Sequence, residues 1–341
     1  MESACRAFAS RMVDGFADRG LSVLAVFEFE FSVGTRDVDG EFAPAREGPG
    51  YGDIALVRNH DFALDLVTTM EAQGLGLQQF HPEYADGQFE MSFAPRDPVG
   101  AADAAMVIRQ TVRAVARRHG LEASFAPQTG PDTGNGAHVH LSLWEGDRNL
   151  MSGGDGPAGM DARGEGFIAG ILEELRAIVA VAVPTVLGYE RLKPHHWSGA
   201  MQCWGTENRE AALRFIQGAT EATAGAANIE IKPVDGTANP YLTIGALLAA
   251  ALHGMDAGDR LPPPTVEDPD GLSDDVKAAR GVRQLPTSLS EAADAFAAST
   301  VLAGAMGDFL YQTFLATRRE ECVQYAGLDV GELIRRLRWR F

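Results

Sequence analysis

The chain has 341 residues, of which 45% are hydrophobic, so it is long enough to bury a large core as one large domain or two. Its formal net charge of −18 argues against a nucleic acid or an anionic membrane as partner, because such partners need a basic surface. The three cysteines are far apart and lack zinc-ligand spacing, and residues 1–20 hold no apolar signal segment, so we expect a protein of the reducing cytoplasm.

Helices and strands alternate through the first third of the chain. Residues 1–19 are typical of an amphipathic helix that ends at Gly20, and a leucine and an apolar strand follow at once. The same order of helix, glycine, leucine and strand recurs at 60–80 and at 99–125. This pattern predicts an α+β fold in which helices cover the apolar side of a sheet.

The remaining segments are assigned by their glycine, proline and apolar content. Residues 33–58 are expected to form a loop or a short excursion, and 188–208 a long loop. The glycine-rich segment 145–165 is expected to be exposed, and 258–275 to cross the surface. Helices are expected at 164–183, from Asn239-Pro240 to about Leu252, and from about 288 onward.

Phenylalanine and glutamate alternate over residues 27–31. On a strand, Glu28 and Glu30 then share one face about 7 Å apart, and the three phenylalanines share the other. A half-exposed strand with its acids in water is one explanation. The other is a cavity in which the acids bind cations.

Three later segments repeat this alternation with similar residue types. Their polar faces carry Gln88, Glu90 and Ser92, then His138, His140 and Ser142, then Glu230 and Lys232. A solvated face is expected to carry more lysine, arginine, threonine and glutamine. Acids and imidazoles on four strands therefore favour the cavity, and a mostly oxygen donor set with imidazoles suits Mg²⁺ or Mn²⁺.

Two such ions can hold nucleotide phosphates and offset charge during phosphoryl transfer. The sequence has no Walker-type loop and no Rossmann glycine fingerprint, so phosphate binding would depend on metals and arginines. Arg191, Arg209 and Arg214 lie close together in the sequence, although each alone could equally be a surface residue.

Six motifs, in their order and spacing, resemble the glutamine synthetase superfamily over essentially the whole chain, 1–341. They lie at 27–30, 81–90, 134–140, 184–192, 208–209 and 230–241. The resemblance implies the family's catalytic domain, an antiparallel curved sheet (a half-barrel) backed by helices. It also implies the family's reaction, in which ATP phosphorylates the γ-carboxylate of glutamate and a nitrogen nucleophile then displaces phosphate to give an amide.

The resemblance also implies roles for individual residues. One divalent ion is expected on Glu30, Glu83 and Glu90, and a second on Glu28, His138 and Glu230. His140 and Ser142 are expected near the nucleotide. Gly134 and Arg191 are expected at the amino-acid substrate, and Arg209 and Arg214 at the phosphates and the acyl phosphate.

Trp197 marks the main departure from ammonia-using members of the family, which carry at this place a flap glutamate that accepts a proton from ammonium. A tryptophan cannot take that proton, but its ring can hold an alkylammonium group. The chain therefore looks like the branch that joins glutamate to polyamines, ethanolamine or similar amines. Loop packing is the alternative explanation for Trp197. The base that deprotonates the amine is left open among His195, His196 and Glu207.

Two further departures concern acyl binding and assembly. Lys232 stands where the family has an arginine. The lysine keeps the positive charge but cannot form the two parallel hydrogen bonds of a guanidinium group. The family's N-terminal β-grasp domain, which completes the neighbouring subunit's site, is expected to be absent, since the chain begins almost at the catalytic domain. We expect a homo-oligomer, although loss of that domain argues against the family's double-ring dodecamer.

The sequence thus predicts an ATP-dependent glutamate–amine ligase with two Mg²⁺ or Mn²⁺ sites, whose partners are glutamate, ATP and a small amine. The alternatives are a glutamine synthetase that uses ammonia and a non-catalytic synthetase-like scaffold or regulator. Trp197 argues against the first alternative. The intact set of metal-ligand types argues against the second, because buried acids without a cation are costly.

Overall fold

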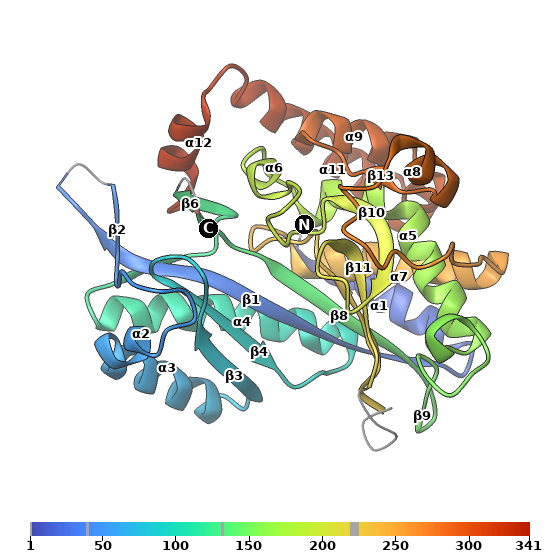
Figure 1. The fold of residues 1–341 in the computed structure, drawn as a ribbon, viewed down its shortest axis with the longest axis horizontal. Helices are drawn as coiled ribbons and strands as arrows, with labels where there is room; N and C mark the ends of the chain where they lie inside the picture. Colours follow the sequence, from blue (N-terminus) through green and yellow to red (C-terminus); the bar gives the residue numbers. More distant parts are fainter. Residues whose placement is uncertain (1, 39–40, 131–132, 219–224) are drawn as a thin grey trace.

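The computed structural model describes residues 2–38, 41–130, 133–218 and 225–341, and its centre is one open sheet (Figure 1). The main path of the sheet runs β13-β10-β11-β12-β8-β1-β4-β3, and β2, β5 and β9 pair at its sides. β1 is Ser22–Arg36 and pairs with both β4 and β8. The other strands of this sheet are β2 Phe42–Pro44, β3 Leu77–Pro82, β4 Gln88–Phe93, β5 Glu122–Ser124, β8 Ala137–Glu145, β9 Arg148–Asn149, β10 Met201–Thr206, β11 Ala211–Ile216, β12 Asn228–Ile231 and β13 Arg283–Gln284. A separate two-stranded sheet consists of β6 Gln128–Gly130 and β7 Thr133–Gly134.

Helices pack against the apolar face of the sheet and against one another. α4 lies on β1, and α7 packs against α1, α4 and α5. The helices are α1 Glu2–Ala17, α2 Ile54–Arg58, α3 His60–Ala72, α4 Pro98–Arg118, α5 Ala162–Ala182, α6 Gly188–Arg191, α7 Pro240–Ala257, α8 Asp274–Arg280, α9 Leu289–Ala298, α10 Thr300–Met306, α11 Asp308–Gln324 and α12 Val330–Leu337. None of these described helices has the length and apolar character needed to cross a bilayer.

The two long central helices begin where the sequence predicts. The Asp97 side chain accepts a hydrogen bond from the Gly100 amide at the start of α4, and Asn239 caps the Tyr241 and Leu242 amides at the start of α7. In both helices a proline follows the cap, where its missing N–H costs no helical hydrogen bond.

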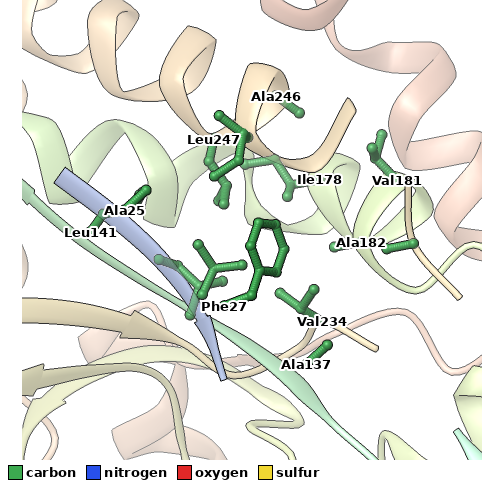
Figure 2. Packing of buried hydrophobic residues seen from close by; sticks show 14 of the residues in the cluster. Ala25, Phe27, Ala137, Leu141, Ile178, Val181, Ala182, Val234, Ala246 and Leu247 are labelled. Atoms are coloured by element: carbon green, nitrogen blue, oxygen red, sulfur yellow. The ribbon is translucent and has the colours of Figure 1, made fainter. Parts of the chain in front are cut away.

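The phenylalanine face of β1 is the main contact between the sheet and the helices. Phe27, Phe29 and Phe31 are all nearly inaccessible to solvent. Figure 2 shows the Phe27 ring among apolar side chains of β8, α5 and α7. Because side chains alternate along a strand, this buried face fixes the orientation of Glu28 and Glu30 toward the opposite side.

The predicted α+β class, the open sheet and the helical backing are confirmed. Gly20, Gly74 and Gly120 all have positive φ, near +70°, after their helices, as the helix–glycine–leucine pattern requires. The loop predicted at 33–58 is partly wrong, since β1 continues to Arg36 and β2 and α2 follow.

The long loop predicted at 188–208 is also wrong. It contains α6 and β10, and β10 pairs in parallel with β11, so the sheet is not wholly antiparallel. Residues Met201–Gly205 of β10 are buried on both faces and show no polar alternation, which hid the strand from pattern analysis. The helix predicted to end near Leu252 continues to Ala257, where Gly258 ends it.

Candidate active site

Polar side chains of six neighbouring strands face away from the helices and lie opposite one another in the strand register. Glu90 of β4 pairs with His81 of β3 on one side and with Glu30 of β1 on the other. Glu28 pairs with His138 of β8. Glu230 of β12 pairs with His140 of β8 and with Arg214 of β11. Residues far apart in the chain thus form one polar surface.

A cavity of about 610 Å³ lies over this polar surface. Twelve of the fourteen predicted site residues line it: Glu28, Glu30, Glu83, Glu90, Gly134, His138, Arg191, Trp197, Arg209, Arg214, Glu230 and Lys232. The two that do not line it are His140 and Ser142. Of the candidate bases, His195 and His196 line the cavity and Glu207 does not.

The first carboxylate group of the cavity gathers around two histidines of β8. Donor atoms of Glu28, His140 and Glu230 lie within 4.8 Å of one another. His138 lies beside them, because its Nδ1 is 3.0 Å from Glu28 Oε1 and 3.3 Å from Glu230 Oε1. The predicted trio of Glu28, His138 and Glu230 is therefore brought together, and His140 joins it.

Hydrogen bonds and fixed cations hold this first group in its ionised form. Burial opposes the charge of Glu28, but the hydrogen bond with His138 outweighs it and lowers the pKa of Glu28. Burial also opposes the charge of Glu230, but Lys232, the two histidines and Arg214 lower the pKa of this carboxyl well below its usual range. Lys232 Nζ and Arg214 Nη1 each donate to Glu230 at 3.1 Å.

The second carboxylate group lies at the β3–β4 end of the cavity. Donor atoms of His81, Glu83 and Glu90 lie within 4.8 Å of one another, and His81 Nε2 is 3.1 Å from Glu90 Oε1. Burial and the neighbouring carboxylates raise the pKa of Glu90 to about 7, and burial and Glu30 raise that of Glu83. The hydrogen bond to Glu90 raises the pKa of His81 to about 9. Protons therefore offset the charge of this group near neutral pH.

Glu30 lies between the two groups. Its Oε2 accepts hydrogen bonds from the Gly136 amide at 2.8 Å and from Gln88 Nε2 at 3.2 Å, and its Oε1 is 3.7 Å from His138 Nε2. The same Gln88 amide also donates to the Gly134 carbonyl at 2.7 Å. Gln88 thus ties Glu30 to the segment that carries Gly134. The sequence placed Gln88 on the polar face beside Glu90 but gave it no role.

The donor set fits divalent cations. Five carboxylates with three imidazoles, mostly oxygen donors, are the kind of ligand set that Mg²⁺ and Mn²⁺ take. Among the residues that the structure describes, buried His140 Nε2 has no hydrogen-bond partner. It lies 3.9 Å from Glu28 Oε2, so a lone pair or proton of this ring is directed at the first carboxylate group. Glu28, His138, His140 and Glu230 could hold one ion, and Glu30, His81, Glu83 and Glu90 a second.

Arg191, at the end of α6, reaches the cavity from the side of β8. It is 4% exposed, and its guanidinium donates to His138 Nε2 at 3.0 Å and to the Val234 carbonyl at 3.3 Å. A side chain at Gly136 would place its Cβ 2.4 Å from Arg191 Nη2. A side chain at this position would therefore displace the arginine from its place beside His138.

The residues predicted to contact the phosphates and the nucleotide have different surroundings in the structure. Arg209 lines the cavity, and Arg214 bridges Glu230 and Glu207. His140 Nδ1 lies 3.0 Å from Asn228 Oδ1. Ser142 accepts a hydrogen bond from Trp144 Nε1. The predicted contact of Ser142 with the nucleotide stays a prediction.

Aromatic residues line the cavity near the flap, which is the segment between α6 and β10 that carries Trp197. Tyr51, Tyr84 and Trp197 all line the cavity. Burial and the charge of Glu83 raise the pKa of Tyr51 to about 12, so its hydroxyl keeps its proton. The sequence analysis did not select Tyr51 or Tyr84. Tyr84 follows Glu83 directly, and that adjacency was the available signal.

Asp235 lies against α6, the helix that carries Arg191, because a Cβ on Gly188 would come within 2.7 Å of its Oδ2. It is 1% exposed, its Oδ1 accepts from the Thr237 amide at 2.8 Å, and its Oδ2 has no hydrogen-bond partner in the part of the chain that the structure describes. Burial raises its pKa to about 6 from 3.8. The folded state holds the proton of Asp235 more tightly than the unfolded state does. Protonated Asp235 therefore adds to the free energy of unfolding fully below about pH 4, and this contribution is lost as the pH rises through about 6.

We therefore expect Asp235→Asn to gain stability over the wild type as the pH rises from 4 to 7. The relative gain should be about 2–3 kcal/mol, because two pKa units correspond to about that much. Urea unfolding of both proteins across this range measures it. A difference between them that is constant with pH would contradict the assignment.

Comparisons with known proteins give the family of the chain. Residues 2–330 match the family described as glutamine synthetase, catalytic domain. The chain belongs to the glutamine synthetase family. It is 44% identical over 342 residues to gamma-glutamylpolyamine synthetase GlnA3 of Streptomyces coelicolor, covering 99% of this chain and 73% of that protein. It is 34% identical to a glutamine synthetase of Mycobacterium tuberculosis, covering 84% of this chain and 65% of that protein.

Solved structures give the same family. A crystal structure of a novel glutamine synthase homologue superposes with a TM-score of 0.86 at 33% identity, over 97% of this chain and 74% of that chain. GmaS in complex with ADP superposes with a TM-score of 0.84 at 30% identity, over 95% and 75%. The predicted glutamine synthetase-type fold is confirmed, and so is the prediction of an enzyme of the class that forms carbon–nitrogen bonds.

Proposed function

We propose that the cavity binds glutamate, ATP and two divalent cations, Mg²⁺ or Mn²⁺, and that it joins glutamate to an organic amine. The γ-carboxylate of glutamate attacks the terminal phosphate of ATP and forms γ-glutamyl phosphate and ADP. The amine nitrogen then attacks the acyl carbon, phosphate leaves, and the amine loses a proton. The product is a γ-glutamyl amide.

The arrangement that most supports this proposal is the pair of carboxylate–imidazole groups on one face of the sheet, with arginines beside them. When bound, divalent cations supply positive charge that offsets the charge of the nucleotide phosphates and of the transferring phosphoryl group. Arg191 would bind the α-carboxylate of glutamate. Arg209 and Arg214 would add positive charge toward the phosphates.

The acceptor is assigned from the flap. Trp197 has its ring at the cavity and a backbone φ of 49°, a strained value for a residue other than glycine. An indole ring offers apolar contact and cation–π attraction to an alkylammonium group but cannot accept its proton. The Streptomyces coelicolor relative is named for polyamines. Both observations support an organic amine as acceptor in preference to ammonia.

The chemistry is tested with glutamate labelled with ¹⁸O in the γ-carboxylate, together with ATP, Mg²⁺ or Mn²⁺ and a panel of amines that includes ammonium. We expect amine-dependent release of phosphate that carries one labelled oxygen, and a product with the mass of the γ-glutamyl amide. Unlabelled phosphate would contradict the acyl-phosphate step. The absence of turnover with every amine and with ammonium would overturn the proposed function.

A further inference from the structure

Two exposed aromatic rings from separate segments meet at the cavity. The ring centroids of Tyr84 and Trp197 are 5.7 Å apart and the rings are nearly perpendicular. Tyr84 belongs to the turn between β3 and β4, and Trp197 belongs to the flap between α6 and β10. Tyr84 is 59% exposed and Trp197 49% exposed, so this contact is not part of the apolar core.

The Tyr84 side is held in place by the residues around it. The Tyr84 amide donates to Glu83 Oε2 at 2.7 Å. The neighbouring loop is tied to the same turn, because the Tyr51 amide and Arg46 Nη2 both donate to the Glu83 carbonyl. A Cβ on Gly50 would lie about 3.0 Å from Tyr84, so the loop packs closely against this residue. Tyr84 is thus presented from a fixed turn that also carries a predicted metal ligand.

The Trp197 side is also ordered. Ser198 is fully buried, and its hydroxyl donates to the Lys193 carbonyl at 3.1 Å across the flap. Within the described residues, five non-glycine residues have positive φ, and three of these, Tyr51, His195 and Trp197, line this cavity. Backbone strain of this kind persists where the surrounding structure enforces it, often at ligand sites.

We propose that Tyr84 is a specificity-determining residue and that, with Trp197, it binds the alkyl chain of a primary aliphatic amine. This inference rests on the proposed function. The reacting nitrogen must reach the acyl group between Arg191 and the carboxylates, so the rest of the amine extends past Glu83 toward the two rings. The two steeply inclined rings offer one face and one edge to a methylene chain. Where the amine carries a second ammonium group at its far end, the rings add cation–π attraction for that group.

The charge around the rings favours a cationic acceptor. His195 lines the cavity beside Trp197, and its imidazole lies 3.6 Å from Asp268 and 3.4 Å from Asp270. Its amide donates to Glu210 at 3.3 Å. Negative groups at an entrance raise the local concentration of cations. Ammonium has the charge but no chain to pack against the rings, so the rings discriminate by chain length.

The test compares wild type, Tyr84→Ala and Tyr84→Phe, using ammonium, methylamine and n-butylamine as acceptors. We expect the ratio of kcat/KM for n-butylamine to that for ammonium to fall about tenfold in Tyr84→Ala, because about two methylene groups lose their contact. Tyr84→Phe keeps the ring and should keep the ratio. Because Tyr84 is exposed, both variants should melt within a few degrees of the wild type. An unchanged ratio in Tyr84→Ala would overturn the proposal.

Calorimetric titration with n-butylamine separates this proposal from the proposed function. Binding to the wild type that weakens about tenfold in Tyr84→Ala supports the subsite even if no turnover is seen, and in that case only the proposed function fails. Equal binding by the wild type and Tyr84→Ala overturns the subsite, and the ligase reaction can still stand on its own labelling test.

Discussion

Replacing Glu30 by alanine is expected to lower turnover by about 10³-fold or more. Glu30 lies between the two carboxylate groups and holds Gly136 and Gln88 through one oxygen. The substitution removes a predicted ligand and also the anchor of the neighbouring glycine segment. Steady-state phosphate release at saturating ATP, glutamate and amine measures the loss, and Mn²⁺ binding measured by calorimetry should weaken with it.

Glu145→Gln is the matched control for this variant. Glu145 lies at the end of β8, is exposed, and pairs with Arg148 and Arg163 away from the cavity. Exposed ion pairs of this kind contribute little, so the control should keep wild-type turnover and Mn²⁺ binding. Wild-type rates in Glu30→Ala would remove Glu30 from the metal assignment.

Replacing Arg191 by lysine is expected to raise the KM for glutamate roughly 30-fold. A lysine keeps the charge but cannot form two parallel hydrogen bonds with a carboxylate, and loss of one charge-assisted bond costs about 2 kcal/mol. It would also lose the contacts with His138 and the Val234 carbonyl. Since the α-carboxylate is bound equally before and during the reaction, kcat should fall less than KM rises.

The KM for ATP separates the role of Arg191 from a general disturbance of the site. We expect it to change less than about threefold in Arg191→Lys, because the nucleotide phosphates are assigned to other residues. Arg148→Lys, at an exposed pair on β9, should leave both KM values unchanged. A parallel rise of the KM for ATP and for glutamate would argue against carboxylate recognition by Arg191.

The polar face of the sheet could be predicted from the sequence because side chains on a strand alternate with a period of two. Three buried phenylalanines on β1 fix the direction of Glu28 and Glu30, and the same rule applies to Glu90, His138 and Glu230. The alternation within each strand segment therefore predicted which side chains share the polar face. These side chains are carboxylates and imidazoles, which indicated a cation site.

The pairing of those strands could not be predicted from local pattern. Register depends on contacts between distant segments, and it is register that places His81 opposite Glu90 and His140 opposite Glu230. The resemblance assigned each ion three ligands, and the structure adds one imidazole to each group. His81 was visible in its motif, but only its position across from Glu90 makes it a candidate ligand.

The region after Arg191 was predicted least well. β10 is buried on both faces and pairs in parallel with β11, so neither alternation nor a hairpin turn marks it. The contact between Tyr84 and Trp197 joins segments more than a hundred residues apart in the sequence. Sequence reasoning found Trp197 through a departure from the family pattern and had no comparable reason to select Tyr84.

Lys232 shows how the structure compensates for one departure from the family. Its ammonium group donates to Glu230 at 3.1 Å, and Arg214 donates to the other oxygen of the same carboxylate. The positive charge is thus kept beside the first carboxylate group. The guanidinium fork that an arginine would offer at this place is missing.

Direct competition between two acceptors tests the central claim most directly. Purified protein is given ATP, glutamate, Mg²⁺ or Mn²⁺, and equal concentrations of ammonium and 1,4-diaminobutane, and both amide products are quantified by mass spectrometry. The account predicts mono-γ-glutamyl-diaminobutane in at least about tenfold excess over glutamine, with one ADP formed for each amide. Glutamine as the main product would contradict it.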